Sequence, residues 1–124
     1  VIDETRKILD MPALRVSCTA VRVPTFACHG EAVQVVTRED ISRDELTFAL
    51  QGKEGLTVLD APRELVYPMP VNAVEAMDVF VGRVRKHPDK PRTYDLWIVS
   101  DNLWKGAALN SLQIAERMMR DGHL

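Results

Sequence analysis

Residues 79–99, VFVGRVRKHPDKPRTYDLWIV, decide the fold that the sequence predicts. The two ends of this stretch, Val79–Arg85 and Tyr94–Val99, are rich in β-branched and aromatic residues, which favour strands. The segment between them, Lys86–Pro91, is polar and contains two prolines, as turns do. We therefore expect two neighbouring antiparallel strands joined by this turn.

Three other stretches are also predicted to be strands. Ala32–Thr37 is rich in β-branched residues, and Leu56–Leu59 is a short apolar run. Leu14–Val23 alternates with period two, which is typical of a half-buried strand. Arg22 continues the apolar face of that stretch, and a charged side chain on a buried face usually has a partner or a ligand. The apolar face of this third stretch is made by Leu14, Val16, Cys18 and Ala20.

Helical patterns lie on either side of these strands. Ile2–Leu9 has the pattern of the last turns of a helix that begins upstream, so we expect the chain to be a piece of a longer protein. Ile41–Leu50 is amphipathic, and Ser42 with Glu45 matches a capping box. Leu103–Arg120 is the longest predicted helix. Its apolar stripe consists of Leu103, Ala107, Ile114 and Met118.

The elements add up to three helices and about five strands. This order predicts an α+β fold with a mixed, largely antiparallel sheet and helices on one face. Asp60–Val71 contains three prolines and is expected to be a loop. The G-x-G-x-x-G pattern of dinucleotide-binding domains does not occur in the chain.

Composition limits the class of protein. With 124 residues and 46% hydrophobic positions, the chain is long enough for one domain with a core. Its net charge of −2 gives no electrostatic reason to bind nucleic acid or anionic lipid. No apolar run approaches the roughly 20 residues of a membrane span. Two cysteines are too few for a disulfide framework, so we expect a reducing, cytoplasmic location, and no metal site is predicted.

The stretch from Arg22 to His29 carries the clearest chemical signal. Arg22 lies at the end of the predicted strand, Pro24 stiffens the turn after it, and His29 comes seven positions after the arginine. An arginine can bind a carboxylate with two parallel hydrogen bonds, and a histidine can move protons near neutral pH. The two residues therefore look like part of an active site.

Four blocks of sequence together resemble the C-terminal half of the aspartate-semialdehyde dehydrogenase family. They occur in the family's order and run nearly from end to end of the chain. The blocks are Glu4–Leu9, Arg22–Pro24 with His29, Val81–Arg85, and Asp101–Asn110 followed by Gln113–Glu116.

The resemblance implies a function for the whole protein. Members of this family are two-domain, NADP-dependent enzymes that reductively dephosphorylate aspartyl phosphate to aspartate semialdehyde, on the route to lysine, threonine and methionine. Residues 1–124 are similar to the catalytic and dimerisation domain, which resembles the C-terminal domain of glyceraldehyde-3-phosphate dehydrogenase. The NADP-binding Rossmann half, with the nucleophilic cysteine, then lies outside this chain, and the chain alone is expected to be inactive.

The same resemblance assigns roles to three residues. His29 takes the place of the general base, which a cysteine nucleophile needs because little of it is thiolate at neutral pH. Arg22 matches the arginine that holds the substrate's α-carboxylate, and Asn102 the residue near the cofactor's nicotinamide. Asn102 could equally be the cap of the helix that follows it. Cys28 does not match the family's nucleophile.

Structural explanations remain open for several of these residues. Arg22 could simply pair with Glu31, and Arg83 with Arg85 could form a solvated or interface face as readily as a phosphate site. Cys18 and Cys28 are expected to be small core residues, and His87 and His123 to be solvated.

Other functions compete with this interpretation. One is a related acyl-phosphate reductase, such as N-acetyl-glutamyl-phosphate reductase, and another is a non-catalytic dimerisation module. The strand faces are more apolar than a chain of this size easily covers, so a homodimer or tetramer is expected. The small-molecule ligands expected are aspartate semialdehyde, aspartyl phosphate and phosphate.

Overall fold

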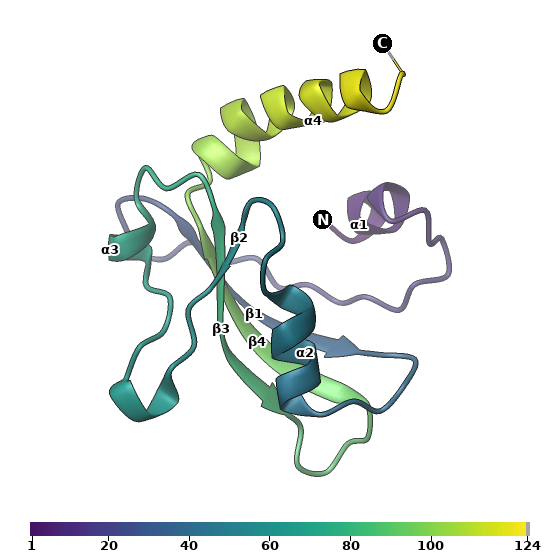
Figure 1. Cartoon of the computed structure of the whole chain (residues 1–124), viewed down its shortest axis with the longest axis vertical. Coiled ribbons are helices and arrows are strands. Elements are labelled where there is room, and N and C mark those ends of the chain that lie inside the picture. The colour runs from purple at the N-terminus through teal and green to yellow at the C-terminus, as the bar shows by residue number, and fades with distance from the viewer. Residues whose placement is uncertain (124) are drawn as a thin grey trace.

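A computed structural model describes residues 1–123 and has a four-stranded sheet at its centre, in the order β1-β4-β3-β2 (Figure 1). The predicted pair is formed by β3 (Val79–Lys86) and β4 (Thr93–Ser100), which run antiparallel. β1 (His29–Val36) is antiparallel to β4 along its whole length, and β2 (Leu56–Val58) is parallel to β3. The predicted α+β class with a mixed, largely antiparallel sheet is confirmed.

Helix α2 is the helix whose start the sequence defines best. The Ser42 hydroxyl accepts a hydrogen bond from the Glu45 backbone N–H at 3.1 Å, and the Glu45 carboxylate accepts one from the Ser42 N–H at 2.7 Å. This capping box is the one predicted. The helices are α1 (Ile2–Ile8), α2 (Arg43–Leu50), α3 (Pro70–Ala73) and α4 (Leu109–Arg120), with a 3-10 turn at Pro62–Glu64 and a π-helical turn at Trp104–Ala108.

Core residues lie on both faces of the sheet, and the two clusters differ in size. On one face, Leu46 and Leu50 of α2, with Ile41 just before the helix, pack over a cluster of buried strand residues. On the other face, the four-residue α3 places Ala73 in a smaller cluster. The first cluster contains Val81, Val84, Tyr94 and Leu96, and the second contains Cys28, Val99 and Ala73.

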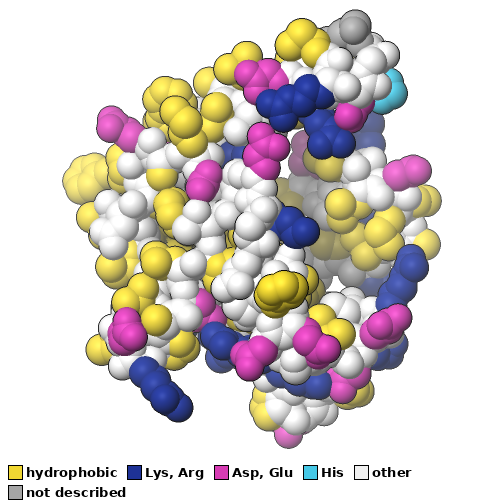
Figure 2. Space-filling view, viewed as in Figure 1, with side chains coloured by type: hydrophobic (Ala, Val, Ile, Leu, Met, Phe, Trp, Pro, Cys, Tyr) yellow, Lys and Arg dark blue, Asp and Glu magenta, His cyan; other side chains and the backbone are white. Residues whose placement is uncertain are grey.

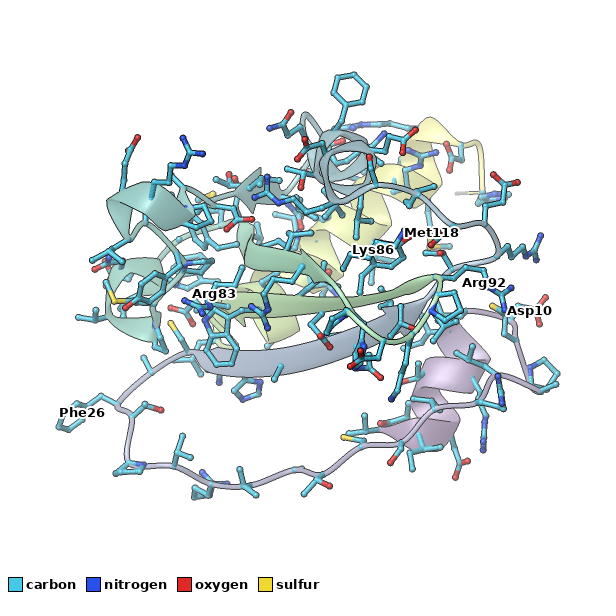
Figure 3. All side chains as sticks on the ribbon, turned by 90° about the horizontal axis from the view of Figure 1, so that it is seen from below. Asp10, Phe26, Arg83, Lys86, Arg92 and Met118 are labelled. Carbon is cyan, nitrogen blue, oxygen red and sulfur yellow. The ribbon has the colours of Figure 1, made fainter. Side chains whose placement is uncertain are left out.

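The predicted strand at Leu14–Val23 is wrong. This segment is extended but belongs to no strand, and only Leu14 and Val16 of its apolar face are half-buried. Period-two alternation predicts an extended backbone, whereas a strand also needs a neighbouring strand to pair its N–H and C=O groups. No strand of residues 1–123 lies beside this segment, and Figure 3 shows it running clear of the sheet, with Phe26 pointing away.

The C-terminal helix also differs in detail from the prediction. It opens with the π-helical turn, and regular α-helix begins only at Leu109. Its apolar stripe is not in the core, since Leu103 is 68% exposed and Ile114 53% exposed. Figure 2 shows hydrophobic side chains over α3 and the adjoining part of α4. None of the helices within residues 1–123 has the length and hydrophobicity needed to cross a membrane.

Candidate functional site at the end of strands β1 and β4

His29 lies where the chain enters the sheet. It is the first residue of β1, is exposed, and is paired in register with Ser100, the last residue of β4. Cys28, directly before it, is buried and has a left-handed backbone (φ 71°), so the chain turns sharply into the strand. The buried Cys28 therefore anchors the backbone from which the exposed imidazole projects.

Asn102 lies at the same end of the sheet, two residues beyond Ser100. Its side chain is half-buried and does not cap the helical turn that follows. The cap interpretation of Asn102 is therefore wrong, because its neighbour Asp101 accepts the hydrogen bond from the Leu103 N–H at 2.9 Å. His29 and Asn102 thus lie at the same end of strands β1 and β4, and the Asn102 amide has no capping role.

Asp101 is the residue that sequence reasoning missed. It is 2% exposed, and its carboxylate accepts hydrogen bonds from the N–H groups of Glu75 at 2.8 Å and Leu103 at 2.9 Å. These donors, with the Trp104 N–H, hold the pKa of the Asp101 carboxyl below its usual range. An aspartate placed before an apolar helical run is a capping signal that could have identified it.

The two cysteines have different environments. Burial, together with the charge of Asp101, raises the pKa of the Cys28 thiol, which disfavours the thiolate that a nucleophile requires. This agrees with the mismatch between Cys28 and the family's nucleophile. Cys18, in contrast, is exposed, so the expectation that it is a core residue is wrong.

Arg22 lies on the extended segment that leads into β1. It is exposed on the extended segment between α1 and β1, so the expected position on a buried strand face is wrong. Within residues 1–123 it forms no ion pair with Glu31, the structural partner considered from the sequence. Its guanidinium is free to bind an anionic group.

Arg83 and Arg85 line a groove on the sheet face opposite α2. The Arg83 guanidinium lies 5.6 Å from the centre of the Tyr67 ring, and Arg85 donates a hydrogen bond to the Arg83 carbonyl at 2.8 Å. The groove has a volume of about 450 Å³ and an apolar floor that includes Ala32 and Trp97. Within residues 1–123 no group of three or more His, Cys, Asp or Glu side chains could hold a metal ion.

Comparison with known proteins identifies the family of this chain. Residues 1–105 match the family model described as semialdehyde dehydrogenase, dimerisation domain. The chain belongs to this semialdehyde dehydrogenase family. It is 46% identical over 120 residues to the aspartate-semialdehyde dehydrogenase of Bacillus subtilis, covering 96% of this chain and 35% of the relative. For the Aquifex aeolicus enzyme the identity is 41%, with 96% and 35% covered.

Solved structures of semialdehyde dehydrogenases have the same fold. A crystal structure of aspartate semialdehyde dehydrogenase II from Vibrio cholerae, complexed with ASA, superposes with a TM-score of 0.87 at 39% identity. The match covers 95% of this chain and 34% of that one. The chain therefore spans about a third of the length of the relatives it matches.

Proposed function

We propose that this chain is the catalytic and dimerisation part of an aspartate-semialdehyde dehydrogenase. In the whole enzyme, aspartyl phosphate is reduced and dephosphorylated to aspartate semialdehyde with NADPH, in the cytoplasm, on the route to lysine, threonine and methionine. The observation that carries the proposal is the sequence identity of 46% to such an enzyme, in a chain whose His29 and Asn102 lie at the same end of strands β1 and β4. The nucleophilic cysteine and the Rossmann half are supplied from outside this chain.

His29 is the general base in this proposal. Its exposed position at the start of β1 leaves the imidazole accessible to a side chain from another domain. The unprotonated ring nitrogen takes the proton from the cysteine thiol, and the resulting thiolate attacks the aldehyde carbon or, in the biosynthetic direction, the acyl phosphate. The imidazolium can later return the proton.

Arg22 binds the α-carboxylate of the substrate. A planar guanidinium forms two parallel hydrogen bonds to a carboxylate, which fixes the orientation of the substrate as well as its position. Because Arg22 is exposed and forms no ion pair within residues 1–123, binding breaks no existing salt bridge.

Asn102 contacts the cofactor. Its half-buried amide is not used as a cap, and an amide has both donors and an acceptor, which suit the carboxamide of a nicotinamide ring. NADP, when bound, supplies the hydride acceptor or donor for the reaction. Asn102 would hold the nicotinamide ring beside His29, at the end of the sheet where β1 begins and β4 ends.

The partner expected for this domain is a second copy of itself, as a homodimer or a dimer of dimers. The family's description names it a dimerisation domain. Within residues 1–123, the sheet face opposite α2 carries the short α3 and the open groove beside Arg83 and Arg85, so it is available to bury the contact.

The test follows NADPH formation from aspartate semialdehyde, phosphate and NADP. The chain is assayed alone and then mixed with the N-terminal part of the Bacillus subtilis enzyme. We expect activity only in the mixture, and a loss of about 10²–10⁴-fold for His29→Ala. The control, His87→Ala, lies in the β3–β4 turn and should keep full activity. Activity that survives the loss of His29 would favour a purely dimerising role.

A further inference from the structure

Asp101 is the most buried charged side chain near the proposed site, and none of the roles given above uses it. A buried carboxylate needs strong hydrogen bonds to offset the loss of water. Its two oxygens have separate partners: one accepts from the Glu75 N–H and the other from the Leu103 N–H. It therefore ties together two segments that lie 28 residues apart, since Leu103 follows Glu75 by that number.

Both of these segments depend on the carboxylate for their backbone geometry. Glu75 has a left-handed backbone (φ 62°), which is strained for a non-glycine residue unless its surroundings fix it. Leu103 is the residue directly before the π-helical turn, and the N–H groups at the start of a helical turn have no partners within it. The Asp101 carboxylate supplies a partner on both sides.

The backbone of Asn102 lies within a hydrogen-bonded ring. The bond from the Leu103 N–H to the Asp101 carboxylate closes this ring around it. The Lys105 N–H also donates to the Asp101 carbonyl at 2.8 Å, which closes a second, overlapping ring. The direction in which the Asn102 side chain leaves the backbone is thus set by Asp101.

We propose that Asp101 is a positioning residue, which fixes Asn102 for contact with the cofactor and touches neither substrate nor cofactor itself. This inference rests on the proposed function, because it is the nicotinamide contact of Asn102 that Asp101 would prepare. When the Asn102 side chain is already held in place, the cofactor binds without the entropy loss of ordering that side chain. Loss of Asp101 should therefore weaken cofactor binding more than substrate binding.

Asp60 provides a matched control. Its side chain is 1% exposed, and its carboxylate likewise accepts hydrogen bonds from two backbone N–H groups, those of Arg83 at 2.9 Å and Val84 at 3.1 Å. It also accepts one from Arg43 at 2.7 Å. These contacts fix the irregularity in β3, away from the β1–β4 edge. An aspartate with a merely structural role should behave as Asp60 does.

The experiment uses the mixed enzyme described above, with NADP and aspartate semialdehyde varied separately. We expect Asp101→Asn to raise the KM for NADP by roughly tenfold or more, as a displaced contact does, and to leave the KM for the aldehyde unchanged. Asp60→Asn should lower the urea midpoint of unfolding without changing either KM. In the double variant Asp101→Asn/Asn102→Ala, the KM for NADP should be no higher than in Asn102→Ala, because Asp101 acts through Asn102. Equal effects on both KM values, or effects of Asp101→Asn and Asn102→Ala that add in full, would overturn the proposal.

A second readout does not depend on activity. In the chain alone, nuclear magnetic resonance relaxation should show the Asn102 backbone and side-chain amides becoming more mobile in Asp101→Asn and unchanged in Asp60→Asn. Unchanged mobility of Asn102 in Asp101→Asn would overturn the proposal even if the mixed enzyme were active. A wild-type mixture without activity would instead count against the proposed function, and the mobility of Asn102 would still decide the role of Asp101.

Discussion

At the scale of single residues, the buried Asp101 carboxylate makes stability depend on pH. The N–H groups of Glu75, Leu103 and Trp104 hold its pKa below the usual value. A carboxyl whose pKa is lowered on folding adds stability above its unfolded pKa of about 3.9, and this is lost as the pH falls through the native pKa. We therefore expect the urea midpoint of the wild-type chain to exceed that of Asp101→Asn at pH 7, and the gap to close below pH 4. Curves that stay parallel down to pH 2 would contradict this.

Tyr94 gives a second residue-scale prediction. Its side chain is completely buried, and its hydroxyl donates to the Ile41 carbonyl at 2.7 Å and accepts from the Ile41 N–H at 2.8 Å. Tyr94→Phe leaves both backbone groups without this partner, which should lower the free energy of unfolding by about 1–3 kcal/mol. Urea denaturation measures the loss. Tyr67→Phe is the control, because the half-buried Tyr67 contacts Arg83 through its ring, and it should change stability little.

Only part of the candidate site could be predicted, because some of its contacts join residues that are far apart in the sequence. His29 was expected in the loop before a strand at Ala32–Thr37, whereas β1 already begins at His29, because pairing with β4 extends the strand beyond its β-branched residues. The role of Asp101 depends on Glu75, which no pattern around Asp101 announces. Arg22 was expected on a buried face, and its exposure depends on whether a neighbouring strand is present, which alternation in one segment does not specify.

At the scale of elements, a substitution at the start of α2 measures how much one capping residue contributes to the free energy of unfolding. Ser42→Ala removes the hydroxyl that accepts from the Glu45 N–H and should destabilise the chain by about 1 kcal/mol. The hydroxyl of Ser111, an exposed residue of α4, instead donates a hydrogen bond to the Ala107 carbonyl in the π-helical turn before this helix. Ser111→Ala should be neutral or slightly stabilising, because alanine is the better helix former. Chemical denaturation of both variants distinguishes a capping effect from a general effect of replacing serine, and equal losses would contradict the capping role.

The elements that sequence reasoning identified correctly are those fixed by nearby residues. The β3–β4 pair is joined by a short polar turn, and α2 carries its own cap. Leu14–Val23 has as strong an alternation as any strand, yet it lacks a partner within residues 1–123. β1 lies at one edge of the sheet and has a neighbouring strand on one side only. Pairing between elements is decided by the whole assembly, so it is the feature least accessible from the pattern of one segment.

At the scale of the whole molecule, the two faces of the sheet are covered to different extents. One face is closed by α2, whereas the other carries α3 and the open groove with its apolar floor. Val71 on α3 is exposed, and Figure 2 shows hydrophobic side chains over this helix. Large apolar surfaces of this kind mark sites of protein association. A second copy of this chain is the occupant that the family's description favours.

This proposal predicts that a single charge on the open face prevents association. Ala32 is exposed on β1, is paired in register with Trp97, and lines the groove. A buried charge without a partner is costly, and the groove beside Ala32 already holds Arg83 and Arg85, so Ala32→Lys should convert a dimer at micromolar concentration into a folded monomer in sedimentation velocity. Phe48→Lys adds the same charge on α2, where Phe48 is 78% exposed over the opposite face, and should leave the dimer intact. If both variants remained dimeric, the contact would lie elsewhere on the chain, and a monomeric wild-type chain would remove the dimer itself.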